Sequence, residues 1–373
     1  KEKNPHIITI FGGPHPTALP DEVAAEEAVD IVSIGEGEET IKELAECIEK
    51  NKSYSNVRGI AFISDRTHEF VLTPDRPLCD LAFVPEPAYD LLPGHISDYH
   101  IYVETGRGCL HNCSFCANPI LWKRKVRRFS PERVYKRLKN LSEQLPTGTL
   151  VHIVDPAFGF MEQDEKLCKM LIENPVSLRF SCDMCAGNVN EGIIDLLYKA
   201  GFVMFCVGIE NCNSQILKIN HKPATIETIF QACKIIRKVC NAIIKTYWII
   251  GLPGESIQSA RDNCDQIISM LKNGFFDICC EHIFVPYPGC DVYNNPEKYQ
   301  YKIIHHNWEC YDARNFPLAG ESETFSMESA YIAFLDLLRA RCELYKLQDY
   351  YERSLLTNDR EKTNFMTYRK RLI

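Results

Sequence analysis

The sequence lacks several features that would place it outside the ordinary globular proteins. No uninterrupted apolar run reaches the about 20 residues that a helix needs to cross a bilayer, so no membrane span is expected. Residues 12–15 interrupt the apolar start of the chain, and the sequence therefore shows no secretory signal peptide. There is no internal repeat or low-complexity tract. With 45% hydrophobic and 25% charged residues, the composition excludes collagen, coiled coils and disordered proteins.

An excess of positive charge is also lacking. The formal net charge of the 373 residues is -8, so the chain is not built to neutralise a phosphate backbone, and a nucleic-acid partner is not expected. At roughly 150 residues per domain, two or three structural units are expected.

Cysteine, in contrast, is abundant, with 18 residues in a chain that is too long to need disulfides for its stability. Most of them fall inside strand-like or helix-like stretches. Without an export signal, they indicate reduced thiols in a cytoplasmic protein, and most are expected to be small buried side chains.

Three cysteines stand together in residues 104–121 (ETGRGCLHNCSFCANPIL). Cys109, Cys113 and Cys116 have the spacing C-x3-C-x2-C, which lets three thiolates converge on one soft metal. Iron–sulfur clusters usually take four cysteines, and no fourth lies nearby in the sequence, so one iron would keep an open position. Structural zinc and three unrelated buried thiols are the alternatives that spacing alone leaves open.

The segment RGCLHNCSFC, with Phe115 just before the last cysteine, resembles the signature of the radical S-adenosylmethionine (SAM) superfamily. It is closest to the subgroup that carries a cobalamin-binding domain at its N-terminal end. The resemblance implies that Cys109, Cys113 and Cys116 hold a [4Fe–4S] cluster. It also implies that the open iron binds SAM, which one electron cleaves to a 5′-deoxyadenosyl radical.

The segment after the cysteines alternates apolar, β-branched runs with helical patterns, which predicts parallel strands buried on both faces. The predicted strands are residues 149–154, 177–182, 202–209, 243–250 and 278–285. The predicted fold class is α/β: a partial (β/α)6 TIM-like radical SAM barrel, preceded by an incomplete Rossmann-like unit of the cobalamin-binding type and followed by a helical C-terminal extension.

Polar residues and glycines follow these strands, at the edge where parallel barrels carry their chemistry. Taken singly, each is also explained by turn formation. The segments VGIEN, WIIGLPGES and VPYPGC occur in the order found in the resembling family, although no clear Gly-Gly-Glu follows the first strand. The resemblance implies a SAM site formed by Phe115, Asp155, Arg179, Ser181, Glu210 and Gly251.

The residues ahead of the cysteines predict strands at 7–13 and 31–37 and helices at 20–28 and 39–49. They are similar to the end of the cobalamin-binding domain in the resembling subgroup. The candidate cobalamin contacts are Gly12, Gly13, His15, Thr17, Glu36 and Gly37. Two such strands cannot enclose a corrinoid, so we expect a partner chain or a preceding segment to complete the unit, unless cobalamin binding has been lost.

These patterns divide the chain into four parts. Residues 1–75 form the partial Rossmann unit, 76–100 a linker, 101–290 the barrel, and 291–373 a C-terminal extension that includes a helix at 327–350. The extension is the variable part in which substrate specificity is expected.

Two further motifs have open interpretations. The basic run KRKVRR at residues 123–128 is either a solvated helix face or a docking site for an acidic reductase. Cys182 and Cys185 form a CxxC motif that predicts buried thiols rather than a second cluster, since no matching pair accompanies it.

The function predicted from the resemblance is reductive SAM cleavage followed by cobalamin-dependent methylation of an unactivated carbon. A cobalamin-independent radical SAM oxidation, cyclisation or rearrangement is the first alternative, and a non-catalytic iron–sulfur or zinc protein is the second. The expected partners are a small-molecule or peptide substrate and an electron donor such as flavodoxin or ferredoxin. No residue is predicted as a catalytic acid or base.

Overall fold

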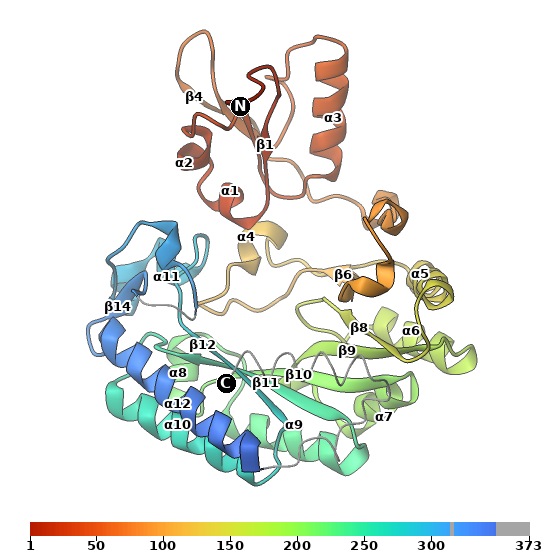
Figure 1. Cartoon of the computed structure of the whole chain (residues 1–373), viewed down its shortest axis with the longest axis vertical. Coiled ribbons are helices and arrows are strands. Elements are labelled where there is room, and N and C mark those ends of the chain that lie inside the picture. The colour runs from red at the N-terminus through yellow and green to blue at the C-terminus, as the bar shows by residue number, and fades with distance from the viewer. Residues whose placement is uncertain (314–316, 348–373) are drawn as a thin grey trace. The chain divides into compact units, whose positions relative to one another are not determined.

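The computed structural model describes residues 1–313 and 317–347, with side chains as far as residue 341. The chain divides into two compact units (Figure 1). The first unit combines residues 1–85, 108–127 and 287–295, and the second combines residues 86–107, 128–286 and those from 296 onward.

A four-stranded sheet forms the centre of the first unit. Its order is β1 (Ile10–Phe11), β2 (Ile31–Ser33), β3 (Ile60–Ile63), β4 (Phe70–Leu72). The pair β1–β2 is parallel, and the other two pairs are antiparallel. The strands predicted at 7–13 and 31–37 are therefore present but shorter, and only these two follow the doubly wound pattern.

Three helices accompany this sheet: α1 (Pro14–Ala18), α2 (Pro20–Ala24) and α3 (Glu38–Glu49). Proline at the first helical position of α1 and α2 is favourable, because that position needs no N–H donor. Helix α3 packs Leu44 against Ile31 and Ile60, and all three side chains are fully buried. The helix predicted at 39–49 is confirmed, whereas the one predicted at 20–28 ends earlier, at Ala24.

The first unit also contains the short helices η1 (Leu81–Phe83), α4 (Asn118–Trp122) and α11 (Asp291–Asn294). The two-residue strands β6 (Gly106–Arg107) and β7 (Arg127–Arg128) stand at the two ends of the segment that carries the cysteine triplet.

Six parallel strands form the sheet of the second unit. In order they are β5 (Ile101–Val103), β8 (Thr149–Ile153), β9 (Leu178–Cys185), β10 (Phe202–Glu210), β11 (Ile243–Ile250) and β12 (Ile278–Ile283). Every neighbouring pair is parallel, and the sheet curls as half a barrel does (Figure 1). This architecture confirms the predicted partial (β/α)6 barrel.

Helices connect the strands and cover one face of the sheet, which we call the outer face (Figure 1). They are α5 (Pro131–Gln144), α6 (Glu162–Glu173), α7 (Glu191–Lys199), α8 (Ser214–Ile219), α9 (Ile226–Val239) and α10 (Ile257–Lys272). The predicted cap of α5 is confirmed, since the Ser130 side chain accepts a hydrogen bond from the Arg133 N–H and Pro131 is the first helical residue. Apolar strand residues under these helices, such as Val151 and Phe205, are fully buried.

The remaining elements of the second unit are short except for one. They are η2 (Tyr89–Leu91), η3 (Ile96–Asp98), η4 (Ala186–Asn188), η5 (Pro296–Tyr299), η6 (Trp308–Cys310) and the antiparallel pair β13 (Tyr301–Ile303) and β14 (Gly320–Ser322). The long helix α12 (Met327–Leu347) packs on α10, and Arg341 forms a buried ion pair with Glu281 of β12 at 2.8 Å. The helical extension is confirmed; its predicted last residues, 348–350, lie outside the described residues.

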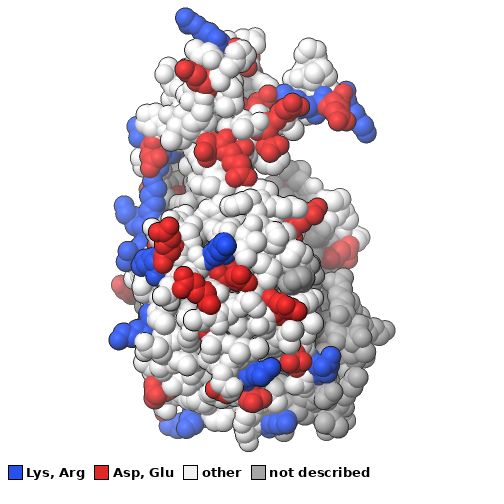
Figure 2. Space-filling view, turned by 90° about the vertical axis from the view of Figure 1, so that its left-hand side faces the viewer, with Lys and Arg blue, Asp and Glu red and all other residues white. Residues whose placement is uncertain are grey.

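The prediction that residues 123–128 form a helix is wrong, although Lys123, Arg124 and Lys125 are exposed to solvent as predicted. Helix α4 ends at Trp122, because Lys123 and Arg124 have left-handed backbones with φ of 48° and 57°. Lys123 pairs with Asp75 at the surface at 3.0 Å, whereas the side chain of Arg128 is only 2% exposed. Charges of both signs are interspersed on the face seen in Figure 2. Among the described helices, none has the length and apolarity that a bilayer crossing demands.

Candidate active site

The three cysteines of the triplet lie on one tight loop ahead of α4. The Cys116 N–H donates to the Cys113 carbonyl at 3.1 Å, and all three side chains are half-buried thiols. The loop closes on itself at Gly108, where φ is 95° and a Cβ would stand 1.9 Å from the Lys125 carbonyl oxygen. Only glycine fits there, so the turn ahead of the first cysteine depends on this residue.

A fourth cysteine, Cys290, lies near the triplet although it is distant in the sequence. The Val292 N–H donates to the carbonyl of buried Ser114 at 3.1 Å, which joins the segment 287–295 to the cysteine loop. The pKa of the Cys290 thiol is raised to about 11, mainly by burial and to a smaller extent by the nearby Cys116. Its sulfur also accepts the Tyr293 N–H at 3.3 Å, as an N-cap does. Cys290 is therefore a neutral thiol at neutral pH.

The CxxC motif does not form a pair of converging thiols. Both cysteines belong to β9, and residues three apart in a strand point to opposite faces. Cys182 is fully buried on the outer face, and burial holds its pKa well above the usual range, whereas Cys185 is half-buried. This geometry favours two separate thiols, as the sequence predicted.

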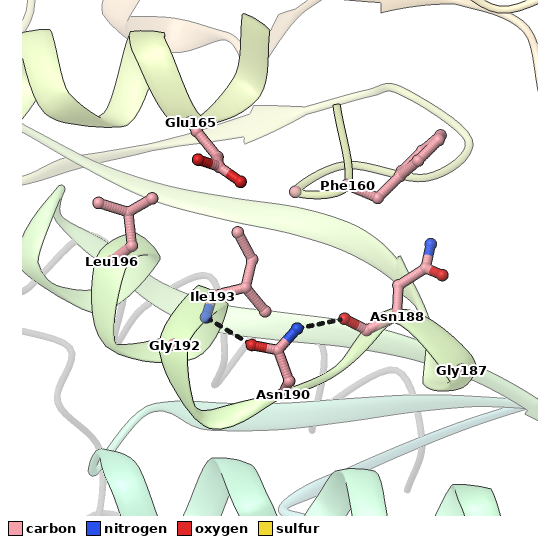
Figure 3. A pocket seen from close by; sticks show the side chains of 9 residues that line it. Phe160, Glu165, Gly187, Asn188, Asn190, Gly192, Ile193 and Leu196 are labelled. Carbon is pink, nitrogen blue, oxygen red and sulfur yellow. Dashed lines mark hydrogen bonds between the residues drawn. The ribbon is translucent and has the colours of Figure 1, made fainter. Parts of the chain in front are cut away.

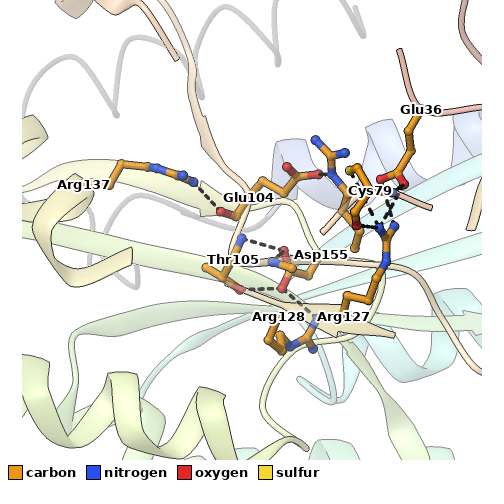
Figure 4. A network of polar contacts seen from close by, with 10 residues as sticks. Glu36, Cys79, Glu104, Thr105, Arg127, Arg128, Arg137 and Asp155 are labelled. Atoms are coloured by element: carbon orange, nitrogen blue, oxygen red, sulfur yellow. Dashed lines mark hydrogen bonds and ion pairs between the residues drawn. The ribbon is translucent and has the colours of Figure 1, made fainter. Parts of the chain in front are cut away.

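Asp155, which follows β8, connects to both ends of the cysteine loop (Figure 4). Its carboxylate accepts the N–H groups of Thr105 and Gly106 at 2.9 and 3.1 Å, as well as the Thr105 hydroxyl. On the other side of the loop, the Arg128 guanidinium lies 3.2 Å from the same carboxylate. We call this set the Asp155 clamp: residues 105, 106, 128 and 155, all within the second unit.

Burial dominates the electrostatics of the clamp. It raises the pKa of Asp155 to about 6, although Arg128 and the Thr105 hydrogen bonds oppose this shift. Asp164 shares the same cation, with its Oδ1 at 2.9 Å from Arg128 Nε. Two fully buried carboxylates on one guanidinium make a network that is costly to open.

Glu210 ends β10 in an unusual backbone conformation. Its φ is 67°, a left-handed value that costs energy for a residue other than glycine. The side chain is only 10% exposed and forms an ion pair with Lys222 at 2.8 Å. At Gly208 a Cβ would come within 2.6 Å of Glu210 Oε1, so glycine there leaves room for the pair.

Gly251 ends β11 and is held by a carboxylate four residues later. Its φ is 90°, and its N–H donates to Glu255 Oε2 at 2.5 Å, while the Asn211 side chain donates to Oε1. Glu255 is fully buried, and burial raises its pKa to about 7. The turn GLPGE is thus closed by a carboxyl group that titrates near neutral pH.

Replacing Glu255 by glutamine is expected to flatten the pH dependence of stability between pH 5 and 8. A carboxyl with a raised folded-state pKa stabilises the fold most below its unfolded pKa of 4.5, and it loses that contribution as the pH rises through about 7. The loss is on the order of 3 kcal/mol at pH 8. Urea unfolding of the reduced protein at several pH values measures it.

Glu162→Gln, at a fully exposed position of α6, is the matched control and should follow the parent protein. A Glu255→Gln variant whose stability falls with pH as steeply as that of the parent would contradict the prediction. Part of the slope should remain, since Asp155 titrates with the same sign.

The other residues predicted for the SAM site are spread more widely. Phe115 is half-buried in the cysteine loop. Ser181 is 2% exposed and lies 2.9 Å from His152 Nδ1. Arg179 is an exposed residue near the start of β9, away from the carboxyl edge of the sheet. These assignments stay predictions.

The residues predicted to contact cobalamin surround the carboxyl ends of β1 and β2. They are Gly12, Gly13, His15, Thr17, Glu36 and Gly37. Gly13 begins α1 with φ of 106°, and Gly37 begins α3. The Thr17 hydroxyl accepts the Gly35 N–H at 2.9 Å, and Glu36 forms an ion pair with Arg127 at 2.8 Å (Figure 4). These contacts hold two turns of the sheet in place, and the cobalamin assignments stay predictions.

A cavity of about 500 Å³ lies elsewhere, between α6 and α7 (Figure 3). Its lining includes Phe160, Asn188 and a single titratable side chain, Glu165. The Asn190 side chain caps α7 by accepting the Ile193 N–H at 3.0 Å. With no cysteine and one acid, this cavity offers no chemistry comparable to that of the strand ends.

Sequence reasoning missed several residues that the structure brings to these sites. Lys222 had no local signal, because its partner lies in another segment. Glu255 and Cys290 lie inside the quoted segments WIIGLPGES and VPYPGC but were not singled out. His152, Asp183 and Tyr247 lie on three strands in which polar and apolar residues alternate. Parallel strands buried on both faces are apolar throughout, so this alternation was a signal in the sequence.

Comparison with known proteins agrees with this geometry. The model of the radical SAM superfamily matches residues 103–267, and that of the B12 binding domain matches residues 1–45. The chain therefore carries a radical SAM domain at residues 103–267. Residues 1–45 match the B12 binding domain.

The chain is similar in sequence to an uncharacterized methyltransferase of Pyrococcus horikoshii, PH0819. It is 26% identical over 297 residues, which cover 78% of this chain and 63% of that protein. An anaerobic magnesium-protoporphyrin IX monomethyl ester cyclase of Synechocystis is 25% identical and covers 67% of this chain and 51% of its own length. The chain thus spans roughly half to two thirds of these relatives.

Among solved structures, the fold is similar to that of the cobalamin-dependent SAM radical enzyme OxsB, in a structure with aqua-cobalamin and SAM bound. The TM-score is 0.71 at 16% identity, over 97% of this chain and 58% of that one. This similarity establishes the fold alone.

Proposed function

We propose that this protein reductively cleaves SAM at a [4Fe–4S] cluster held by Cys109, Cys113 and Cys116. The observation that carries the proposal is three half-buried thiols on one tight loop, in a chain that matches the radical SAM superfamily. The donor set fits a cluster with one iron left open, because soft thiolates bind iron and the loop itself supplies three of them. When bound, the cluster supplies the electron that splits the sulfonium of SAM.

Residues of this chain would then position the cofactors. The assigned SAM contacts are Phe115, Asp155, Arg179, Ser181, Glu210 and Gly251. Glu210, which ends β10, and Gly251, which follows β11, have the best geometric support. Both have left-handed backbones, the Glu210 carboxylate pairs with Lys222, and the Gly251 N–H donates to Glu255. Asp155 is better suited to positioning the cysteine loop than to touching SAM, because its oxygens already bind Thr105, Gly106 and Arg128.

The proposed outcome is cobalamin-dependent methylation of an unactivated carbon. The B12 binding domain match and the methyltransferase relative support this choice. Gly12, Gly13, His15, Thr17, Glu36 and Gly37 are the proposed cobalamin contacts. The first-unit sheet is small for a corrinoid, so strands from a preceding segment or a partner chain would complete it.

Anaerobic reconstitution followed by dithionite and SAM tests the radical step. The chain should bind about four irons and release 5′-deoxyadenosine. A protein that binds zinc instead, or a cluster protein that releases no nucleoside, would support the non-catalytic alternative and overturn the proposal.

A cobalamin-independent oxidation or cyclisation is the second candidate, because one relative is a cyclase. Corrinoid absorbance in the purified protein distinguishes the two. With SAM labelled in its methyl group, methyl transfer places the label in the product, whereas oxidation or cyclisation leaves the product unlabelled.

The proposed substrate is a small molecule or a peptide, and the proposed electron donor is a flavodoxin or ferredoxin. Arg124 and Lys125 remain the candidates for docking an acidic donor, since Lys123, Arg127 and Arg128 are engaged in ion pairs. The reduced thiols fit a reducing compartment such as the cytoplasm.

A further inference from the structure

The inner face of the barrel sheet, opposite the helices, carries a cluster of polar side chains. Barrel interiors are usually filled by branched apolar side chains. Here the strand register places polar side chains at alternate positions on four neighbouring strands: His152 on β8, Ser181 and Asp183 on β9, Cys206 on β10, and Lys245 and Tyr247 on β11. Polar side chains without partners are costly in a packed apolar core, so these residues favour contact with a polar molecule.

The Asp183 carboxylate is the hub of this polar face. The Tyr247 hydroxyl donates to Asp183 Oδ1 at 3.2 Å, and His152 Nε2 lies 3.5 Å from Oδ2. The other ring nitrogen of His152 lies 2.9 Å from the Ser181 hydroxyl. Three strands therefore fix one carboxylate from two sides.

The Asp183 carboxylate is partly exposed to solvent, and it has room to accept further hydrogen bonds. The side chains of His152 and Asp183 are 20% and 29% exposed, whereas Val151, Ile153 and Phe180 of the same strands are buried. A carboxylate has about four acceptor positions. Both contacts are longer than the about 2.7–2.9 Å of a strong charge-assisted hydrogen bond, so a ligand donor has room to bind.

The neighbouring groups favour a hydrogen-bond donor over an anion. Burial raises the pKa of Tyr247 above its usual range, and nearby Cys206 and Asp183 raise it further, so the phenol stays neutral. Burial likewise raises the pKa of Cys206 to about 12. The Lys245 ammonium lies over the Tyr247 ring, 5.0 Å from its centroid. The carboxylate of Asp183 is thus the negative group that a ligand meets at this hub.

We propose that Asp183, His152 and Tyr247 form a subsite that binds a hydroxyl or ammonium group of the substrate. The subsite deepens the proposed function. It rests on the proposed function only for the statement that its ligand is a substrate. Tyr247 and His152 act by holding the carboxylate in place, and Asp183 accepts the donor of the ligand.

Ligand-observed NMR on the reconstituted full chain tests the subsite with small probes. Ethylene glycol and ethanolamine offer hydroxyl and ammonium donors, 1,2-dimethoxyethane has the same skeleton without a donor, and acetate is an anion. We expect the two donor probes to bind and the other two not to bind. Asp183→Asn should weaken the better donor probe about tenfold.

Asp195→Asn on α7 is the matched control, because that carboxylate is 51% exposed and pairs only along its own helix with Lys199. It should leave probe binding unchanged. If Asp183→Asn does not fold, Tyr247→Phe carries the test, with Tyr198→Phe at an exposed position as its control.

Equal binding of a donor probe to the parent and to the Asp183→Asn variant would overturn the subsite. Binding of 1,2-dimethoxyethane or acetate as tight as that of the donor probes would also overturn it, as would no binding of either donor probe. Probe binding does not require SAM. A preparation that binds the probes but releases no 5′-deoxyadenosine would therefore overturn the proposed function and leave the subsite standing.

Discussion

Replacing Cys113 by alanine is expected to abolish release of 5′-deoxyadenosine and to lower the bound iron sharply. The loop offers three thiolates, and a cluster that loses one of them exposes a second iron and is not retained. Iron analysis, the absorbance of the reconstituted protein, and chromatography after addition of dithionite and SAM measure the effect. Nucleoside release should fall to the level of the mixture without protein.

Cys290→Ser is the matched control for this loss. Serine caps a helix N-terminus as well as the thiol does, so α11 should keep its cap. The Cys290 sulfur already accepts the Tyr293 N–H at 3.3 Å as the N-cap of α11, and Cys290 lies outside the loop that carries the triplet. A Cys290→Ser protein should therefore keep its iron and its nucleoside release. If it loses both to the same extent as Cys113→Ala, Cys290 closes the fourth position and the assignment of an open iron fails.

The features that the sequence predicted correctly are those encoded over short distances. The strands at 149–154, 202–209 and 243–250 are contiguous apolar runs, and the cap of α5 is a Ser-Pro pair. Their parallel order follows from the alternation with helices, since a parallel connection needs a crossover. The cysteine triplet was visible for the same reason, because its three cysteines lie within one loop.

Long-range pairing accounts for most of what the sequence could not predict. The basic run was interpreted as a solvated helix face because its acidic partners lie far away: Asp75 for Lys123, Glu36 for Arg127, and Asp155 and Asp164 for Arg128. The proximity of Cys290 to Cys116 likewise depends on the return of the segment 287–295. No local pattern encodes such contacts.

The polar inner face lies between these two cases. The residues Arg179, Ser181 and Asp183 recur with a period of two in β9, and Lys245 and Tyr247 do so in β11. A parallel strand covered on both faces should be apolar throughout. The polar period therefore indicated an accessible inner face, although only the register of the strands shows which side chains meet.

Replacing Asp155 by alanine is expected to destabilise the second unit and to release the ends of the cysteine loop. The change removes the acceptor of the Thr105 and Gly106 N–H groups and leaves Arg128, 2% exposed, with Asp164 as its remaining carboxylate. Leaving a buried N–H donor without an acceptor costs about 1–3 kcal/mol for each donor. The clamp joins residues on both sides of the loop, so the loss reaches the loop itself.

Two measurements report the effect of Asp155→Ala without requiring catalysis. Urea unfolding of the protein without iron should show the loss of stability, and hydrogen exchange should show faster exchange of the Thr105 and Gly106 amides. After reconstitution, the iron content should fall as well. Asp155→Asn, which keeps an acceptor oxygen, should lie between the alanine variant and the parent protein, and Asp195→Asn at an exposed site should match the parent.

The order of these effects separates a clamp from a direct SAM ligand. A clamp predicts that loop exchange and iron content change together, before SAM is added. A residue that only touched SAM would leave both unchanged and weaken SAM binding alone. If Asp155→Ala keeps its iron and the slow exchange of Thr105 and Gly106 while losing SAM affinity, the carboxylate belongs to the SAM site, as the sequence first suggested, and not to the support of the loop.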